Sequence, residues 1–359
     1  MKDRVVIGMS GGVDSSVAAY LLKKQGYEVI GVTMKLRNSE DFEQDSSKDS
    51  CCSLSSVEDA RRVCNKLDIP FYVMNFTEVF EEKVVNYFID EYFKGRTPNP
   101  CIACNKYVKF DALLKKAKAL EAKYVATGHY ARVFYDSNIK RYLIRKSATE
   151  LKDQTYVLYN LTQDQLKHIL MPLGDYTKDE TRRIASELNF DVANKPDSQE
   201  ICFIEDNDYG KFLRQRKGES IKPGYFLDTK GNVLGKHKGI VHYTVGQRKG
   251  LGISLGKPMY VVDIIPDKNQ VILGEEEEVF KKELVAINAN FLPFDELQHP
   301  MRVRAKIRYS AAESDAWIIP ERDNRFRLFF DEAQRAITPG QAVALYQDDY
   351  LIGGGVILK

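Results

Sequence analysis

The stretch Arg4-Val5-Val6-Ile7-Gly8-Met9-Ser10-Gly11-Gly12-Val13-Asp14-Ser15-Ser16 decides how this chain folds. It opens with a short apolar run, which is typical of a buried strand, and from Ser15 to Gln25 apolar side chains recur at helical spacing. A glycine-rich turn joins the two. Glycines let the backbone turn tightly beside an anion, and the N–H groups at the start of a helix attract phosphate. The stretch therefore predicts a strand, a phosphate-binding loop and a helix.

The alternation of strand and helix continues outward from this stretch. Further strands are expected at 27–34, 71–75 and 124–129, and further helices at 57–67, 79–93 and 110–120. This order predicts an α/β fold with a doubly wound parallel sheet and helices on both faces. From about Gly218 onward, short alternating stretches separated by turn residues indicate β structure. We expect a catalytic domain over 1–206, a small central β-rich domain over 207–279 and a third, β-rich domain over 280–359.

Bulk composition excludes several classes of protein. The chain has 359 residues, a net charge of +2 and 43% hydrophobic residues, which is ordinary for a globular protein. No stretch approaches the roughly 20 apolar residues of a membrane span, and the N-terminus lacks the pattern of a signal peptide. Six cysteines in a chain of this length are not a disulfide framework. We therefore expect a cytoplasmic protein that does not bind membranes.

The glycine-rich loop differs from two common phosphate-binding motifs. It lacks the Gly-Lys-Ser/Thr ending of a Walker loop and the Gly-x-Gly-x-x-Gly of a dinucleotide-binding turn. It resembles the PP-loop of the adenine nucleotide α-hydrolase-like superfamily, whose members split ATP between the α- and β-phosphates. The alternative is a glycine-rich helix cap without a ligand, which the strand context, the aspartate and the paired serines disfavour.

The PP-loop resemblance implies which residues hold the nucleotide. The cofactor is expected to be ATP, with Mg²⁺ as its counter-ion. The residues implied are Gly8, Met9, Ser10, Gly11, Gly12, Val13, Asp14 and Ser15 in the loop, with Met34 and Gly128 at the ends of two further strands. Such strand ends lie at the carboxyl edge of the sheet, where open α/β folds bind ligands.

The cysteines allow three interpretations. Cys101 and Cys104 form a Cys-x-x-Cys pair, which occurs in zinc sites and in redox pairs. A zinc site usually needs a second spaced pair, and Cys51 and Cys52 are adjacent, so no metal site is expected. The third interpretation is sulfur transfer, in which one thiolate carries a persulfide and a distant one, such as Cys202, completes the chemistry. Cys64 fits the apolar face of a helix and is expected in the core.

A set of motifs in fixed order narrows the resemblance from the PP-loop superfamily to one family within it. They lie at 8–15, 95–100, 104–106, 126–131, 152–156, 198–203, 243–250 and 339–341. Together they resemble the bacterial tRNA-specific 2-thiouridylase family. Each motif alone is modest, whereas the ordered set is highly specific and runs from Gly8 nearly to the end of the chain.

The resemblance implies a reaction, its partners and a barrel-like C-terminal domain. ATP adenylates the C2 oxygen of the wobble uridine of tRNA, and sulfur then replaces that oxygen, giving 2-thiouridine, AMP and pyrophosphate. By motif position, Cys104 is the nucleophile and Cys202 the persulfide carrier, and a disulfide bond between them is implied. The implied sulfur donor is a protein, either a cysteine desulfurase or a sulfur-relay carrier. We expect the enzyme to be a monomer.

The same resemblance implies the contacts with tRNA. The target-base segment falls on Asn99, Pro100 and Cys101, where some members carry Asp at the third position, so Cys101 departs from that pattern. The remaining implied contacts with tRNA are His129, Lys152, Asp153, Gln154, Arg308, Tyr309 and Gln341.

One argument for RNA binding rests on the residues alone. Between Arg302 and Tyr309, basic and apolar residues alternate strictly. On a strand, the four cations Arg302, Arg304, Lys306 and Arg308 would share one face and could follow a phosphate backbone. The alternative is a solvated strand face without a ligand.

Two other functions compete with tRNA thiolation. One is an amidating PP-loop ligase, which needs no cysteine pair but usually needs a source of ammonia, and no glutaminase module is recognisable. The other is a non-catalytic RNA-binding protein that has kept a nucleotide pocket, which the intact loop and both cysteine motifs disfavour.

Overall fold

The structure, a computed structural model, describes residues 2–37, 54–149, 152–197, 201–204 and 208–359. The Cys51-Cys52 pair and residues 198–200 of the Cys202 motif lie outside the described residues. The chain forms two compact units. Unit 1 comprises Met1–Val85, Cys101–Phe203 and Asp348–Ile352, and unit 2 comprises Asn86–Pro100, Ile204–Gln347 and Gly353–Lys359.

Unit 1 is built on a five-stranded parallel sheet in the order β3-β2-β1-β4-β7. The strands are β1 (Arg4–Gly8), β2 (Glu28–Lys35), β3 (Phe71–Asn75), β4 (Tyr124–Ala126) and β7 (Ile169–Leu170). The chain moves outward from β1 first to β2 and β3, and later to β4 and β7. The sheet is therefore doubly wound, which confirms the predicted fold class.

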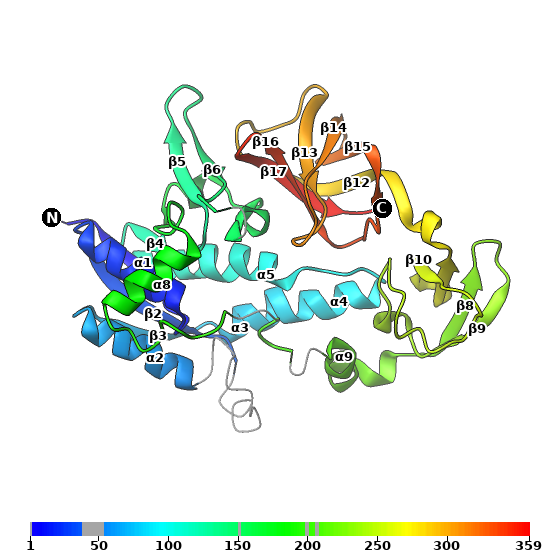
Figure 1. Cartoon of the computed structure of the whole chain (residues 1–359), viewed down its shortest axis with the longest axis horizontal. Helices are drawn as coiled ribbons and strands as arrows, with labels where there is room; N and C mark the ends of the chain where they lie inside the picture. The colour runs from blue at the N-terminus through cyan, green and yellow to red at the C-terminus, as the bar shows by residue number, and fades with distance from the viewer. Residues whose placement is uncertain (1, 38–53, 150–151, 198–200, 205–207) are drawn as a thin grey trace. The chain divides into compact units, whose positions relative to one another are not determined.

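Helices cover both faces of this sheet (Figure 1). The helices that belong wholly or mostly to unit 1 are α1 (Val13–Lys24), α2 (Leu54–Lys66), α3 (Thr77–Phe80), α5 (Pro100–Ala103), α6 (Leu113–Ala119), α7 (Gln163–Leu166) and α8 (Lys178–Glu187). Val5 and Ile7 of β1 share one core with buried residues of α1, α2 and α8. Gly8 faces the other side, where a Cβ atom on it would lie 3.9 Å from Leu113 Cδ2 of α6. A strand covered on both faces explains the continuous apolar run of β1.

The position of β1 creates the binding edge of the sheet. It lies between β2 and β4, which the chain reaches in opposite directions. At such a switch point the loops diverge above the carboxyl ends of the strands and leave room for a ligand. The glycine-rich loop Ser10–Gly12 lies here, between the end of β1 and the start of α1.

Three features of the N-terminal half differ from the sequence prediction. An antiparallel hairpin, β5 (Arg132–Asp136) and β6 (Arg141–Arg145), interrupts the expected alternation, and within unit 1 β6 also pairs with Tyr350 and Leu351. The strand expected at 124–129 ends at Ala126. The helix expected at 110–120 begins at Pro100 and continues through Cys104–Ala112 into α6. Proline is favoured in the first position of a helix, because that position needs no N–H donor.

Unit 2 contains two β sheets with distinct topologies, together with the helices α4 (Tyr87–Phe93) and α9 (Tyr209–Lys217). The first sheet has the order β10-β11-β8-β9 and is formed by β8 (Gly224–Asp228), β9 (Val233–His237), β10 (Tyr260–Ile265) and β11 (Gln270–Gly274). These strands confirm the prediction of β structure in this half of the chain. The division at 206 and 279 into three domains stays a prediction.

Six strands of the second sheet close into a barrel, which confirms the expected barrel-like fold of the C-terminal region. Its strands are β12 (Phe280–Phe291), β13 (Met301–Lys306), β14 (Ser314–Glu321), β15 (Arg325–Arg335), β16 (Ala342–Gln347) and β17 (Tyr350–Ile357). The order is β12-β15-β14-β13-β16-β17, and the last residues of β17 pair back onto β12. Apolar residues at alternate positions fill the barrel, as in Val303 and Ala305 of β13. None of the helices in the described part of the chain has the length and apolar character needed to cross a bilayer.

Candidate active site

The glycine-rich loop has the tight backbone that its sequence predicts. Gly11 has a φ of +71°, and a Cβ atom on it would lie 2.2 Å from the carbonyl oxygen of Ser56. The hydroxyls of Ser15 and Ser16 both donate hydrogen bonds to the Gly12 carbonyl, at 3.2 and 2.8 Å. These bonds fix the loop on the first turn of α1, where backbone N–H groups and the helix dipole favour a phosphate.

The other residues expected around the nucleotide lie beside this loop. A Cβ atom on Gly128, just after β4, would lie 2.8 Å from both the Asp14 carbonyl carbon and the Ser15 nitrogen. Met34, near the end of β2, places its Cε 3.6 Å from the position of a Cβ on Gly8. The fold thus brings Gly8, Met34 and Gly128 to the same edge of the sheet as the loop. The absence of a side chain at Gly128 lets the backbone after β4 pack directly against the first turn of α1.

Asp14 is held by two groups that the sequence analysis did not identify. Lys178 Nζ, on the first residue of α8, donates to Asp14 Oδ1 at 2.7 Å and to Oδ2 at 2.9 Å. The Tyr130 hydroxyl donates to Asp14 Oδ1 at 2.8 Å. A lysine in the first turn of a helix opposes the helix dipole, and this is the sequence signal that could have marked Lys178.

A second carboxylate, Asp197, shares the same lysine. Lys178 Nζ lies 2.6 Å from Asp197 Oδ1, and Lys152 Nζ donates to Asp197 Oδ2 at 2.7 Å. Arg182 lies 3.8 Å away. Burial alone would raise the pKa of Asp197, but hydrogen bonds from Lys152 and Lys178 outweigh it, so the net pKa lies below the usual range. The group around the loop therefore combines two carboxylates with three cations.

The loop backbone is also supported from behind by Lys195. Its Nζ donates to the Gly11 carbonyl at 3.2 Å, to Ser56 Oγ at 3.3 Å and to Asp59 Oδ2 at 2.9 Å. Lys195 lies 184 positions from Gly11 in the sequence, so no local pattern predicts this contact. It ties the segment before Cys202 to the phosphate-binding loop.

The cysteines of the expected sulfur chemistry both belong to unit 1. Cys104 is buried in the helix that follows Pro100, whereas Cys202 is half-buried and Cys101 is exposed. The ring of Phe203, next to Cys202, packs edge-on against Phe80 with centroids 5.7 Å apart. Cys64 is fully buried, which confirms its expected place in the core, and burial raises the pKa of its thiol to about 12. Within the described ranges, no group of three or more His, Cys, Asp or Glu is arranged to hold a metal ion.

Comparison with known proteins agrees with this geometry. Residues 3–206 match the model of the tRNA methyl transferase HUP domain, residues 210–275 that of the tRNA methyl transferase PRC-barrel domain, and residues 281–357 that of the aminomethyltransferase beta-barrel domain. A protein of Acetivibrio thermocellus named tRNA-specific 2-thiouridylase MnmA is 62% identical over 356 residues, covering 99% of each chain. The chain belongs to the tRNA-specific 2-thiouridylase family. The proteins of the same name from Clostridioides difficile and Clostridium acetobutylicum are each 60% identical, covering 100% and 99% of this chain and 99% and 100% of their own.

Several residues that the 2-thiouridylase resemblance assigns to tRNA contacts form hydrogen bonds within unit 1. His129 is buried, and its Nδ1 shares a 2.7 Å hydrogen bond with Thr127 Oγ1. Burial, with a smaller effect of Lys109, lowers the pKa of His129 well below its usual value, so the ring is neutral. Gln154 Oε1 accepts a hydrogen bond from the Tyr130 backbone at 3.0 Å. Asp153 accepts hydrogen bonds from the Ser147 backbone and from Thr155, and burial raises its pKa. Contact of these residues with tRNA stays a prediction.

The other residues that the resemblance assigns to tRNA contacts lie in several different elements of the fold. Asn99 and Pro100 lie at the start of α5, where Pro100 is buried. In unit 2, Arg308 donates to the Arg335 carbonyl at 2.6 Å, and Tyr309 is 46% exposed. Gln341 Nε2 donates to the Thr97 carbonyl at 2.7 Å and so holds the segment before Asn99.

The cationic face expected between Arg302 and Arg308 exists, but neighbouring acids neutralise part of it. Val303, Ala305 and Ile307 are buried, whereas the four basic residues face outward, although strand β13 ends at Lys306. Arg302 forms a two-pronged ion pair with Asp331, and Arg304 lies 3.5 Å from Glu313. Lys306 lies over the ring of Tyr309 at 5.6 Å. The face is therefore less positive than its sequence suggested.

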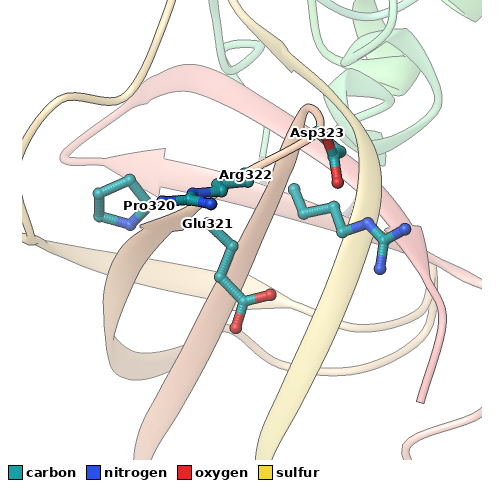
Figure 2. A pocket seen from close by; sticks show the side chains of 5 residues that line it. Pro320, Glu321, Arg322 and Asp323 are labelled. Carbon is teal, nitrogen blue, oxygen red and sulfur yellow. The ribbon is translucent and has the colours of Figure 1, made fainter.

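A hollow on the barrel surface is lined by residues from a different part of the chain. Pro320, Glu321, Arg322, Asp323 and Arg325 line it, at the turn between β14 and β15 (Figure 2). None of the predicted site residues lines it. The hollow follows from the shape of the hairpin turn, in which Asp323 and Asn324 have φ angles of +61° and +54°.

Proposed function

We propose that this protein is an ATP-dependent sulfurtransferase that replaces the C2 oxygen of the wobble uridine of tRNA by sulfur. The main observation behind the proposal is that the phosphate-binding loop lies in the same compact unit as Cys104 and Cys202. Gly128 packs closely against the residues that follow this loop. The full-length identity of 62% to a protein named tRNA-specific 2-thiouridylase supports it.

The first step activates the uridine. The loop from Ser10 to Ser15 is suited to hold the phosphates of ATP, and the strand ends at Met34 and Gly128 are suited to hold the adenosine. Mg²⁺ would arrive with ATP, since it usually keeps several waters and needs few protein ligands. The C2 oxygen attacks the α-phosphorus, the bond to the β-phosphate oxygen breaks, and pyrophosphate leaves. The C2 oxygen is then bonded to the phosphorus of AMP, which is a far better leaving group than a hydroxide ion.

The second step delivers sulfur. Cys202 carries a persulfide, whose outer sulfur attacks C2 while AMP leaves. The Cys104 thiolate then attacks the inner sulfur, the sulfur–sulfur bond breaks, and the tRNA leaves with the outer sulfur at C2. A disulfide between Cys104 and Cys202 remains, and two electrons from an external thiol reduce it for the next cycle.

The persulfide requires a protein partner. A cysteine desulfurase or a sulfur-relay carrier is the expected donor, and the half-buried position of Cys202 suits transfer from another protein more than the buried position of Cys104 does. We expect a monomer that acts on tRNA in the cytoplasm.

The decisive experiment follows both products. Purified protein is incubated with ATP, tRNA, cysteine and a cysteine desulfurase, and the tRNA is then run on a mercury-containing gel. We expect AMP, pyrophosphate and retarded, thiolated tRNA, and mass spectrometry should locate sulfur at the wobble uridine. The variant Cys202→Ser should lose thiolation, whereas Cys64→Ala, a buried cysteine outside the site, serves as the matched control.

Other outcomes would identify the competing functions. Pyrophosphate release without thiolated tRNA would favour a different PP-loop reaction, such as amidation. Tight tRNA binding without any tRNA-dependent pyrophosphate release would favour a non-catalytic RNA-binding protein.

A further inference from the structure

Residues 95–97 belong to unit 2 and are fixed in place from their first residue. Gly95, just after α4, has a φ of +66°, and a Cβ atom on it would lie 2.8 Å from Ile264 Cγ2 of β10. The Arg96 N–H donates to the Glu91 carbonyl at 2.9 Å. The carboxylate of Glu91 is 7% exposed and lies 3.5 Å from Arg96 Nη1. The chain therefore leaves α4 in a defined direction.

The next residue, Thr97, is held by the turn between β15 and β16. Its N–H donates to the Pro339 carbonyl at 2.8 Å, and its carbonyl accepts a hydrogen bond from Gln341 Nε2 at 2.7 Å. A Cβ atom on Gly340 would lie 2.9 Å from the Thr97 nitrogen. Thr97 Oγ1 lies 3.2 Å from Thr244 Oγ1. Both backbone polar groups of Thr97 and its hydroxyl are thus bound within unit 2.

The turn that holds Thr97 is itself attached to the barrel. The Gly340 N–H donates to the Ile357 carbonyl at 2.8 Å, and the Ile357 N–H donates to the Gln341 carbonyl at 2.8 Å. The Gln341 N–H donates to the Thr338 carbonyl at 3.2 Å. Gly340 has a φ of +89°, a conformation that glycine adopts at little cost. The side chain of Gln341 therefore extends from a fixed backbone.

The orientation of Thr97 is passed on to the residues that follow it. Pro98 comes next and is buried, and Pro100 is buried as well. A proline fixes its own φ angle and also restricts the residue before it to extended conformations. Thr97 and Asn99 each precede a proline, so few bonds between Thr97 and Pro100 rotate freely. A hydrogen bond to the Thr97 carbonyl therefore acts on Asn99 and Pro100, two positions or more away.

We propose that Gln341 is a positioning residue for the target base. It fixes the Thr97 carbonyl and thereby the direction in which Asn99 and Pro100 meet the wobble uridine. This inference rests on the proposed function and adds to it a role for Gln341 in the rate of the reaction, as distinct from a role in the affinity for tRNA.

The variant Gln341→Met separates these two roles, because methionine has a similar length, no charge and no N–H donor. We expect kcat for both pyrophosphate release and 2-thiouridine formation to fall about tenfold, since both steps need the base in place. The KM for tRNA should stay within about twofold, because phosphate contacts dominate the affinity for nucleic acid. Gln347→Met, at an exposed position at the end of β16, is the matched control and should behave as the unmodified protein does. A higher KM with an unchanged kcat would overturn the inference, and so would unchanged values of both.

A second measurement does not depend on the proposed function. Hydrogen exchange of the Thr97 amide is followed by mass spectrometry in the tRNA-free protein. Gln341→Met should accelerate this exchange about three- to tenfold, while the amides of β16 keep their rates. An unchanged Thr97 rate, or an equal acceleration in β16, would overturn the inference. If the unmodified protein made no 2-thiouridine, the proposed function would fail, while the exchange rates still decided whether Gln341 holds Thr97.

Discussion

The hydroxyl of Tyr130 donates a hydrogen bond to Asp14 Oδ1 at 2.8 Å, across 116 positions of sequence. Its oxygen also lies 3.1 Å from Thr181 Oγ1, and the ring is fully buried. Tyr130 therefore joins the segment after β4 to the phosphate-binding loop and to α8.

Replacing Tyr130 by Phe should weaken both the fold and ATP binding. A hydrogen bond to a charged group contributes about 1.5–3 kcal/mol, so the free energy of unfolding should fall by about that amount. The KM for ATP should rise, since Asp14 loses one of the groups that orient it. Urea denaturation and initial rates measure the two effects, and Tyr135→Phe is the control because that side chain is 52% exposed. An unchanged KM would show that Lys178 alone holds Asp14.

Replacing Gly128 by Ala should damage the nucleotide site more than the fold. The added methyl group would lie 2.8 Å from backbone atoms of Asp14 and Ser15, which have to move. We expect a destabilisation of about 1–3 kcal/mol and a drop of about tenfold or more in kcat/KM for ATP. Gly218→Ala is the control, because no atom lies within 4 Å of its added methyl group. Equal activity of the two variants would contradict the close approach at the loop.

The stability of unit 2 should decrease in acid because of His242. Burial, followed by the charges of Lys238 and Arg214, lowers its pKa to about 4. The unfolded chain, with a His pKa near 6.5, binds a proton first, so this stabilisation is complete above about pH 6.5 and is lost as the pH falls toward 4. Between pH 8 and pH 5 the loss should be about 2 kcal/mol.

Fluorescence of Trp317, the one tryptophan of the chain, reports urea unfolding of this unit. His242→Gln should reduce the difference between pH 8 and pH 5, whereas His299→Gln, at an exposed position, should retain it. The same acid dependence in both variants would assign the effect to another group.

The cysteines should differ strongly in their rates of alkylation. Cys64 is fully buried and the pKa of its thiol is raised to about 12, so at pH 8 about one molecule in ten thousand carries the thiolate. Cys101 is exposed. A time course with iodoacetamide and peptide mass spectrometry should show Cys101 modified well before Cys64, and unfolding in urea should abolish the difference. Early modification of Cys64 in the folded protein would contradict its place in the core.

The basic face of the barrel should contribute to tRNA binding mainly through Lys306. The charge of Arg302 is largely cancelled by Asp331, whereas Lys306 contacts the ring of Tyr309. We expect Lys306→Ala to weaken tRNA binding and to reduce the slope of log affinity against log salt by about 1. The charge-neutral double variant Arg302→Ala/Asp331→Ala should leave the slope unchanged. A reduced slope in the double variant, with an unchanged slope in Lys306→Ala, would show that the Arg302–Asp331 ion pair opens when RNA binds.

Much of the fold was predictable because its signals are local. The apolar runs of β1 and β2, the glycine-rich loop and the helix after it need only their own neighbours to be recognised. The hairpin β5–β6 was missed, because its strands lie inside a region of alternating strands and helices and carry no distinct apolar pattern. The early start of the helix at Pro100 was missed because Asn99-Pro100 also suits a turn.

The sequence by itself determined the parts of the candidate site: a glycine-rich loop after a buried strand, cysteines in two separate motifs, and strand ends at Met34 and Gly128 that are expected to receive a nucleotide. Only the tertiary structure decided how these parts are connected. Lys178 meets Asp14 across 164 positions, and Lys195 meets Gly11 across 184, and the sequence gives no rule for pairing such distant charges. The physical reason is that motif residues are constrained by their own backbone, whereas ion pairs depend on which helices the sheet brings together.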